Sequence, residues 1–120
     1  MASEGYHEPV ELLNAKVIER HRAITSLMEE LEAVDWYDQR VAASTDDELR
    51  AVVAHNRDEE KEHAAMTLEW LRRNDAKWDE MLRQYLFTSK PIVEVEEQAE
   101  GNGRPTRRNG VGDLRAEPTR

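Results

Sequence analysis

Apolar residues recur every three or four positions along two long stretches of this chain, which is the spacing of an amphipathic helix. The first stretch, residues 10–43, contains neither glycine nor proline, and its apolar series is Leu13, Val17, Ile24, Leu27, Leu31, Val34 and Val41. The second stretch, residues 46–73, carries on one side Leu49, Val52, Val53, Trp70 and Leu71. The pattern therefore predicts two long helices, each with one apolar face to bury.

A polar break at residues 44–47 separates these two helices. Within it, Thr45 stands three residues before Glu48, the spacing of a capping box. Because the connection is short, we expect the two helices to lie antiparallel. A third, shorter helix is predicted from about Asp75 to Phe87, ended by Pro91.

The two ends of the chain lack this pattern. We expect residues 1–8 to be a disordered lead, with Pro9 in the first turn of the first helix. Residues 96–120 are rich in glycine and proline, so we expect a disordered tail after a helical domain at 9–95. Val111 and Leu114 are the large aliphatic residues of that tail, which fits either an unconstrained tail or a short docking motif on a flexible tether.

Composition limits the possible partners. The 120 residues form one domain at most, 36% of them are charged, and the net charge is −9. An acidic surface argues against nucleic acid and anionic membranes and favours cations. With no cysteine, any metal must be held by carboxylate and imidazole, which suits iron, manganese or zinc. No apolar run approaches a membrane span and no signal peptide is evident, so a cytoplasmic protein is expected.

Polar residues interrupt the apolar face of the second helix. At about 100° per residue, Asn56, Glu60, His63 and Thr67 fall in the middle of that face. Glu60 and His63 form a Glu-x-x-His pair, whose two side chains leave a helix on the same side and can reach one ion. The alternative is a chance pair in a glutamate-rich, solvated helix. The position on the apolar face favours metal ligands, because buried charges are costly unless paired or metal-bound.

On the first helix, Glu30 lies at the edge of the apolar face, beside Leu27 and Val34. It is the best candidate for a lone bridging carboxylate. Tyr37 lies two turns on, on the same side, and is either a hydrogen-bond partner that orients a ligand or a tyrosine at the edge of the core.

Glu29, Glu32 and Trp36 lie on the opposite face of the first helix, at i, i+3 and i, i+4 spacing. Three readings remain open for this cluster. It is a weak, solvent-facing cation site on a path to the buried one, a solvated face with one exposed tryptophan, or a subunit contact.

The candidate ligands amount to half of a known kind of site. Di-iron bundle proteins take one Glu from each of two helices and a Glu-x-x-His from each of two more. This chain offers one of each, so we expect a second copy to complete both the site and a four-helix bundle. A small helical unit also buries a limited core alone, which favours oligomerisation.

Four segments of the sequence resemble the encapsulated ferritins: SLMEELEAVDWYDQR at 26–40, HNRDEEKEHAA at 55–65, TLEWLRR at 67–73 and YLFT at 85–88. The resemblance extends over residues 7–95. It implies an all-α fold, an antiparallel two-helix hairpin plus a short C-terminal helix that completes a ferritin-like four-helix bundle by dimerisation. It also implies a ferroxidase, with one di-iron centre at each dimer interface and dimers assembled into a ring-shaped decamer.

The resemblance assigns residues to this centre. Glu30, Glu60 and His63 from each of two subunits would bind two iron ions, and Tyr37 matches the tyrosine that supports them. Glu29, Glu32 and Trp36 match an outer metal-attraction site, where other divalent metals can bind. None of these positions is substituted.

The tail resembles the family's docking peptide for an encapsulin shell, Leu-x-x-Gly-Ser-Leu-Arg. Residues 109–115 keep its core in Val111, Gly112, Leu114 and Arg115. Asn109 and Asp113 depart from it, standing for Leu and Ser. The resemblance implies that the protein works inside an encapsulin nanocompartment, which holds the iron mineral.

Several other functions remain open at this stage. The chain is either a ferroxidase or a non-catalytic metal-binding oligomer used for sequestration or sensing. It is otherwise a structural bundle in which Glu60 and His63 are a satisfied core contact, or a catalase-like or manganese site on the same scaffold.

Overall fold

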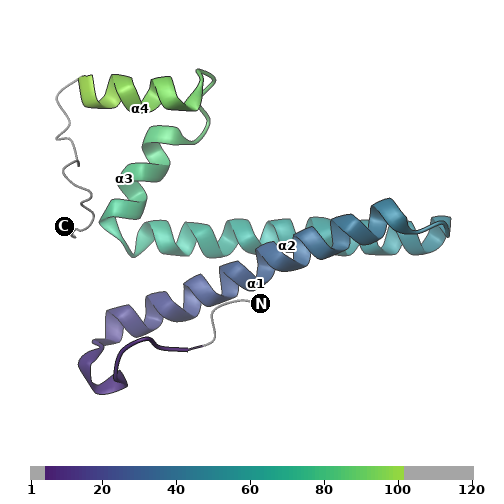
Figure 1. The fold of residues 1–120 in the computed structure, drawn as a ribbon, viewed down its shortest axis with the longest axis horizontal. Helices are drawn as coiled ribbons and strands as arrows, with labels where there is room; N and C mark the ends of the chain where they lie inside the picture. The colour runs from purple at the N-terminus through teal and green to yellow at the C-terminus, as the bar shows by residue number, and fades with distance from the viewer. Residues whose placement is uncertain (1–4, 102–120) are drawn as a thin grey trace. The chain divides into compact units, whose positions relative to one another are not determined.

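The computed structural model describes residues 5–101, and within them it contains helices and no strand (Figure 1). The elements are the 3-10 helix η1 (Val10–Leu12) and the α-helices α1 (Ala15–Ala43), α2 (Asp47–Arg73), α3 (Ala76–Tyr85) and α4 (Ile92–Gly101). None of these helices is long and apolar enough to cross a membrane. The predicted all-α fold is confirmed.

The first long helix begins later than the periodicity predicts. Residues 10–12 form η1, which Pro9 precedes, and α1 starts at Ala15. The cause is Asn14, whose Oδ1 accepts a hydrogen bond from the backbone N–H of Val17 at 2.9 Å and so caps the helix. The ring of Tyr6, in the lead segment, lies with its centroid 4.8 Å from that of His21 on α1.

The start of α2 is capped by Asp46. Its Oδ1 accepts a hydrogen bond from the N–H of Leu49 at 2.8 Å, and its carbonyl accepts from Arg50 at 2.9 Å. The predicted capping box, with Thr45 as its first residue, is therefore wrong by one position. A carboxylate at this point also interacts favourably with the positive end of the helix.

Two contacts between α1 and α2 show that the helices form an antiparallel hairpin. Asp38 on α1 meets Arg57 on α2, with 3.0 Å between Oδ1 and Nη1. Glu30, further back on α1, meets Thr67, further forward on α2. The order is reversed along the two helices, as the short connection predicts and as Figure 1 shows.

The hairpin buries little by itself. Among the described residues, only Ala64 and Leu71 are buried. The apolar faces that the sequence predicts as core are only partly covered: Ile24, Leu31, Leu49 and Val52 are 40–56% exposed. Periodicity identifies residues that share a face, but a single hairpin has no further layer to cover it.

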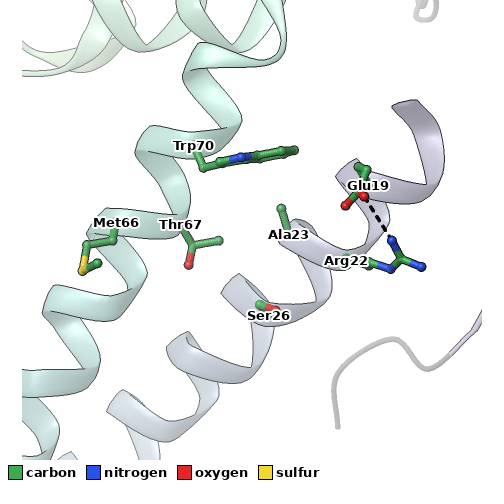
Figure 2. A pocket seen from close by; sticks show the side chains of 7 residues that line it. All are labelled: Glu19, Arg22, Ala23, Ser26, Met66, Thr67 and Trp70. Carbon is green, nitrogen blue, oxygen red and sulfur yellow. Dashed lines mark hydrogen bonds and ion pairs between the residues drawn. The ribbon is translucent and has the colours of Figure 1, made fainter. Parts of the chain in front are cut away.

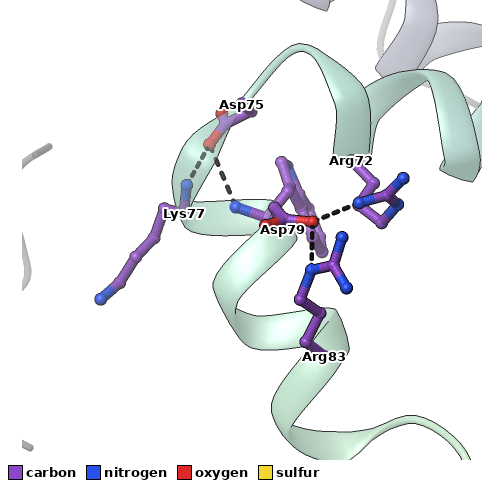
Figure 3. A network of polar contacts seen from close by, with 6 residues as sticks. Arg72, Asp75, Lys77, Asp79 and Arg83 are labelled. Carbon is purple, nitrogen blue, oxygen red and sulfur yellow. Dashed lines mark hydrogen bonds and ion pairs between the residues drawn. The ribbon is translucent and has the colours of Figure 1, made fainter.

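Residues 72–101 form a second compact unit, separate from residues 5–71. Asp75 caps α3 by accepting hydrogen bonds from the N–H groups of Lys77 and Trp78, at 2.9 and 3.1 Å. Asp79 accepts hydrogen bonds from Arg72 and, at 2.9 Å, from Arg83 (Figure 3). These two bonds, Arg72 first, hold the pKa of Asp79 below its ordinary value against the opposing effect of desolvation.

The helical region extends beyond its predicted end. α3 stops at Tyr85, and Phe87 follows with a fully exposed side chain and a φ of 62°. Pro91 directly precedes α4, and its carbonyl accepts a hydrogen bond from the N–H of Val95 at 3.1 Å. Helix α4 then continues to Gly101. The expected disorder from residue 96 is therefore wrong for residues 96–101, because the run Glu-Glu-Gln-Ala-Glu consists of good helix formers. The predicted docking residues Val111, Gly112, Leu114 and Arg115 lie outside the described residues.

Candidate metal centre

The side chain of Glu30, which lies on α1, is contacted by a residue of α2. The Thr67 hydroxyl Oγ1 donates to Oε2 of Glu30 at 3.4 Å. The other carboxylate oxygen, Oε1, is buried and has no hydrogen-bond partner among the described residues. A buried carboxylate oxygen without a partner is costly, and a bound cation removes that cost. Glu30 is therefore suited to be a metal ligand.

Glu60 and His63 lie together on α2, as their spacing predicts. Nδ1 of His63 is 3.5 Å from Oε1 of Glu60. The side chains are 48% and 28% exposed, respectively, so the face on which the sequence places them is open in a single chain. The pair presents a nitrogen and an oxygen ligand at a surface that a second layer of helices can cover.

Glu30 contacts α2 at Thr67, on the helix face that carries Glu60 and His63 but at a different height along the helix. Thr67, which contacts Glu30, follows His63 by one helical turn and Glu60 by about two turns, roughly 10 Å along the axis. Within the part of the chain that the structure describes, no three His, Asp or Glu side chains come close enough to hold one ion. One chain thus offers two separate ligand groups, at different positions along the hairpin.

The predicted supporting and outer residues lie near the surface. Tyr37 is partly exposed, and the guanidinium of Arg40 lies 5.4 Å from its ring centroid. Glu29 is exposed, Trp36 is 48% exposed and Glu32 is partly exposed.

The hairpin also has an open groove that the sequence did not predict. It has a volume of about 400 Å³ and runs between α1 and α2 (Figure 2). Its walls are formed by Glu19, Arg22, Ala23, Ser26, Met66, Thr67 and Trp70. The small residues Ala23 and Ser26, at i, i+3 spacing, are the available sequence signal for a gap between the helices. Thr67 lines this groove and also contacts Glu30, which is not itself one of the lining residues.

A family model described as EncFtn-like matches residues 5–89. The chain belongs to the EncFtn-like family. It is 59% identical to the encapsulated ferritin-like protein of Rhodospirillum rubrum, covering 97% of this chain and 91% of that protein. It is 56% identical to a ferritin-like protein of Thermotoga maritima, covering 93% of this chain and 95% of the relative. The predicted resemblance to encapsulated ferritins is confirmed.

A solved structure has a similar fold. A crystal structure of protein ne0167 from Nitrosomonas europaea matches with a TM-score of 0.72 and 61% identity. The match covers 75% of this chain and 99% of the solved one. The helical fold of this EncFtn-like chain is therefore one that has been observed experimentally in a relative.

Proposed function

We propose that this chain is a ferroxidase subunit that oxidises Fe(II) to Fe(III) at a di-iron centre built by two copies. The observation that carries the proposal is the buried Oε1 of Glu30, which has no hydrogen-bond partner among the described residues. Glu30 contacts Thr67, which shares a face of α2 with Glu60 and His63. The relative that is named an encapsulated ferritin-like protein supports iron as the substrate.

A second copy supplies what one chain lacks. Ligand groups at different heights meet when an identical hairpin packs against the first across a two-fold axis. One Glu60–His63 pair would then hold each iron, and the two Glu30 carboxylates would supply the remaining protein ligands. The same packing covers Ile24, Leu31, Leu49 and Val52, which one chain leaves exposed. Dimers of this kind would assemble further into a ring-shaped decamer.

The reaction moves one electron from each of two Fe(II) ions. With dioxygen as oxidant, two Fe(II) ions, one dioxygen molecule and two protons give two Fe(III) ions and one hydrogen peroxide. Peroxide is the alternative oxidant. Carboxylate oxygens are hard ligands and favour Fe(III) over Fe(II), so Glu30 and Glu60 assist the oxidation. The net charge of −9 raises the local concentration of Fe(II), with Glu29, Glu32 and Trp36 as the outer metal-attraction site.

The same proposal includes the partner. Residues 109–115 would dock the protein inside an encapsulin nanocompartment, which receives the Fe(III). The name of the Rhodospirillum rubrum relative supports this location.

Oxygen uptake during addition of Fe(II), together with native mass spectrometry, tests the proposal. His63→Ala and Glu30→Ala should abolish both rapid oxygen uptake and binding of two metals per dimer. His55→Ala is the matched control, since its Nε2 lies 3.4 Å from Glu59 on the same helix, and it should keep both. Metal binding without oxygen uptake by the wild type would instead show a non-catalytic sequestration or sensing protein.

A further inference from the structure

Thr67 is the residue through which α2 touches the carboxylate of Glu30. Its Oγ1 donates to Oε2 at 3.4 Å, and both residues are partly buried. On its other side, Thr67 lines the groove between the helices (Figure 2). A threonine hydroxyl inside a helix commonly bonds the carbonyl one turn before it, which here belongs to His63. In this structure the hydroxyl proton is donated across to α1 instead.

We propose that Thr67 is a positioning residue for the metal centre: it holds the Glu30 carboxylate in place so that Oε1 stays directed at the metal. This inference rests on the proposed function, because it assumes that Glu30 is a ligand. It adds a residue that acts through Glu30 and does not itself touch the metal.

The physical reason is the freedom of a glutamate side chain. A glutamate has several rotatable bonds, and ordering it costs conformational entropy each time it binds. A hydrogen bond on Oε2 fixes the rotation of the carboxylate before metal arrives, and it leaves Oε1 and one lone pair of Oε2 as ligands. Such contacts behind a metal ligand orient it and adjust its basicity.

The position of Thr67 on α2 gives the contact a second effect. Thr67 follows His63 by four residues and Glu60 by seven, so the three side chains share one face of the helix. Holding Glu30 through Thr67 therefore ties the ligand on α1 to the helix that carries the other two ligands. The spacing between the two ligand groups is set before a second copy binds.

Anaerobic titration of the full chain with Co(II), followed by calorimetry and by the visible absorption of the bound ion, tests this inference. Thr67→Val keeps the shape and removes the hydroxyl, and it should weaken Co(II) binding about 10- to 100-fold. Thr67→Ser keeps the hydroxyl and should bind within a few-fold of the wild type. Thr25→Val is the matched control: Oγ1 of Thr25 is also buried, makes no hydrogen bond among the described residues, and should be dispensable.

Unchanged Co(II) affinity and absorption in Thr67→Val would overturn the inference, as would equal weakening in Thr67→Ser. If Thr67→Val does not fold, the comparison of Thr67→Ser with Thr67→Ala decides, because that pair differs only in the hydroxyl. Higher affinity in Ser than in Ala supports the role, and equal affinity overturns it. Oxygen uptake separately decides whether the centre is a ferroxidase, so the two proposals can fail independently.

Discussion

Arg57 on α2 donates from Nη1 to Oδ1 of Asp38 on α1 at 3.0 Å and, from Nε, to its neighbour Asp58 at 3.1 Å. The bond to Asp58 and then the bond to Asp38 raise the pKa of the Arg57 guanidinium, which stays charged throughout the accessible pH range. The contact between Thr67 and Glu30 lies further from the connection between the helices. Together the two contacts determine which turn of α2 faces which turn of α1.

Arg57→Lys should lower the thermal midpoint of unfolding by a few degrees, because an ammonium cannot serve two carboxylates as the planar guanidinium does. Arg22→Lys is the control, since Arg22 pairs with Glu19 on its own helix and both are well exposed. The difference between the two variants should shrink at high salt. Equal, small changes in both variants would show that the alignment of the helices does not depend on Arg57.

Asp46→Ala should destabilise the protein by about 1 kcal/mol, because it removes the side-chain cap of α2. Thr45→Ala should leave the free energy of unfolding almost unchanged. Chemical denaturation of both variants measures the difference. A larger loss of stability in Thr45→Ala than in Asp46→Ala would instead support the capping box that the sequence suggested.

Asp79→Asn should lower the stability of the protein at neutral pH. It should also make that stability depend less on pH in the acidic range. The folded protein depresses the pKa of Asp79, so the stabilisation is complete above the unfolded value of about 3.9 and is lost as the pH falls through the lower, folded value. The gap in thermal midpoint between wild type and variant should be constant from pH 7 to about pH 5 and close at lower pH. A gap that persists at the lowest pH would assign the effect to something other than the charge of Asp79.

Mixed dimers should reveal that the centre is shared. When wild-type and His63→Ala chains are refolded together in equal amounts, about a quarter of randomly formed dimers contain two wild-type chains. If both irons are needed, the rate of Fe(II) oxidation should fall to about that fraction of the wild-type rate. A rate of one half would mean that each chain works by itself.

The tail is tested by deletion of residues 109–120. The truncated protein should oxidise Fe(II) at the normal rate but no longer co-purify with a co-expressed encapsulin. The double variant Val111→Ser, Leu114→Ser should behave in the same way. Asn109→Leu with Asp113→Ser replaces the two residues that depart from the docking peptide by those of the peptide. This double variant should increase the amount of protein loaded into the encapsulin. Unchanged loading after the deletion would refute the docking role.

Sequence periodicity predicted the long helices and the hairpin well, because helical spacing is a local property. Their ends were less accurate, since Asn14 and Asp46 act through single hydrogen bonds to the backbone. The end at residue 95 was missed because the glycines further along dominated the composition of a segment whose first residues favour helix.

For the candidate site, sequence placed Glu60 and His63 on one face, and the structure agrees. It did not predict their exposure, because a pattern of apolar residues cannot tell whether the same chain or another copy covers them. Thr67 was recognised on that face, but its partner was not. Finding Glu30 opposite Thr67 requires the alignment of the two helices, which depends on contacts between distant residues such as Asp38 and Arg57.

The small core of the described residues, Ala64 and Leu71, has a consequence for how the protein behaves in a cell. If most apolar burial comes from other copies, folding and association are one equilibrium, and stability rises with the concentration of the protein itself. Dilution would then act like a denaturant. The amount synthesised would decide both how many chains exist and what share of them is folded, so that iron oxidation would rise more steeply than expression.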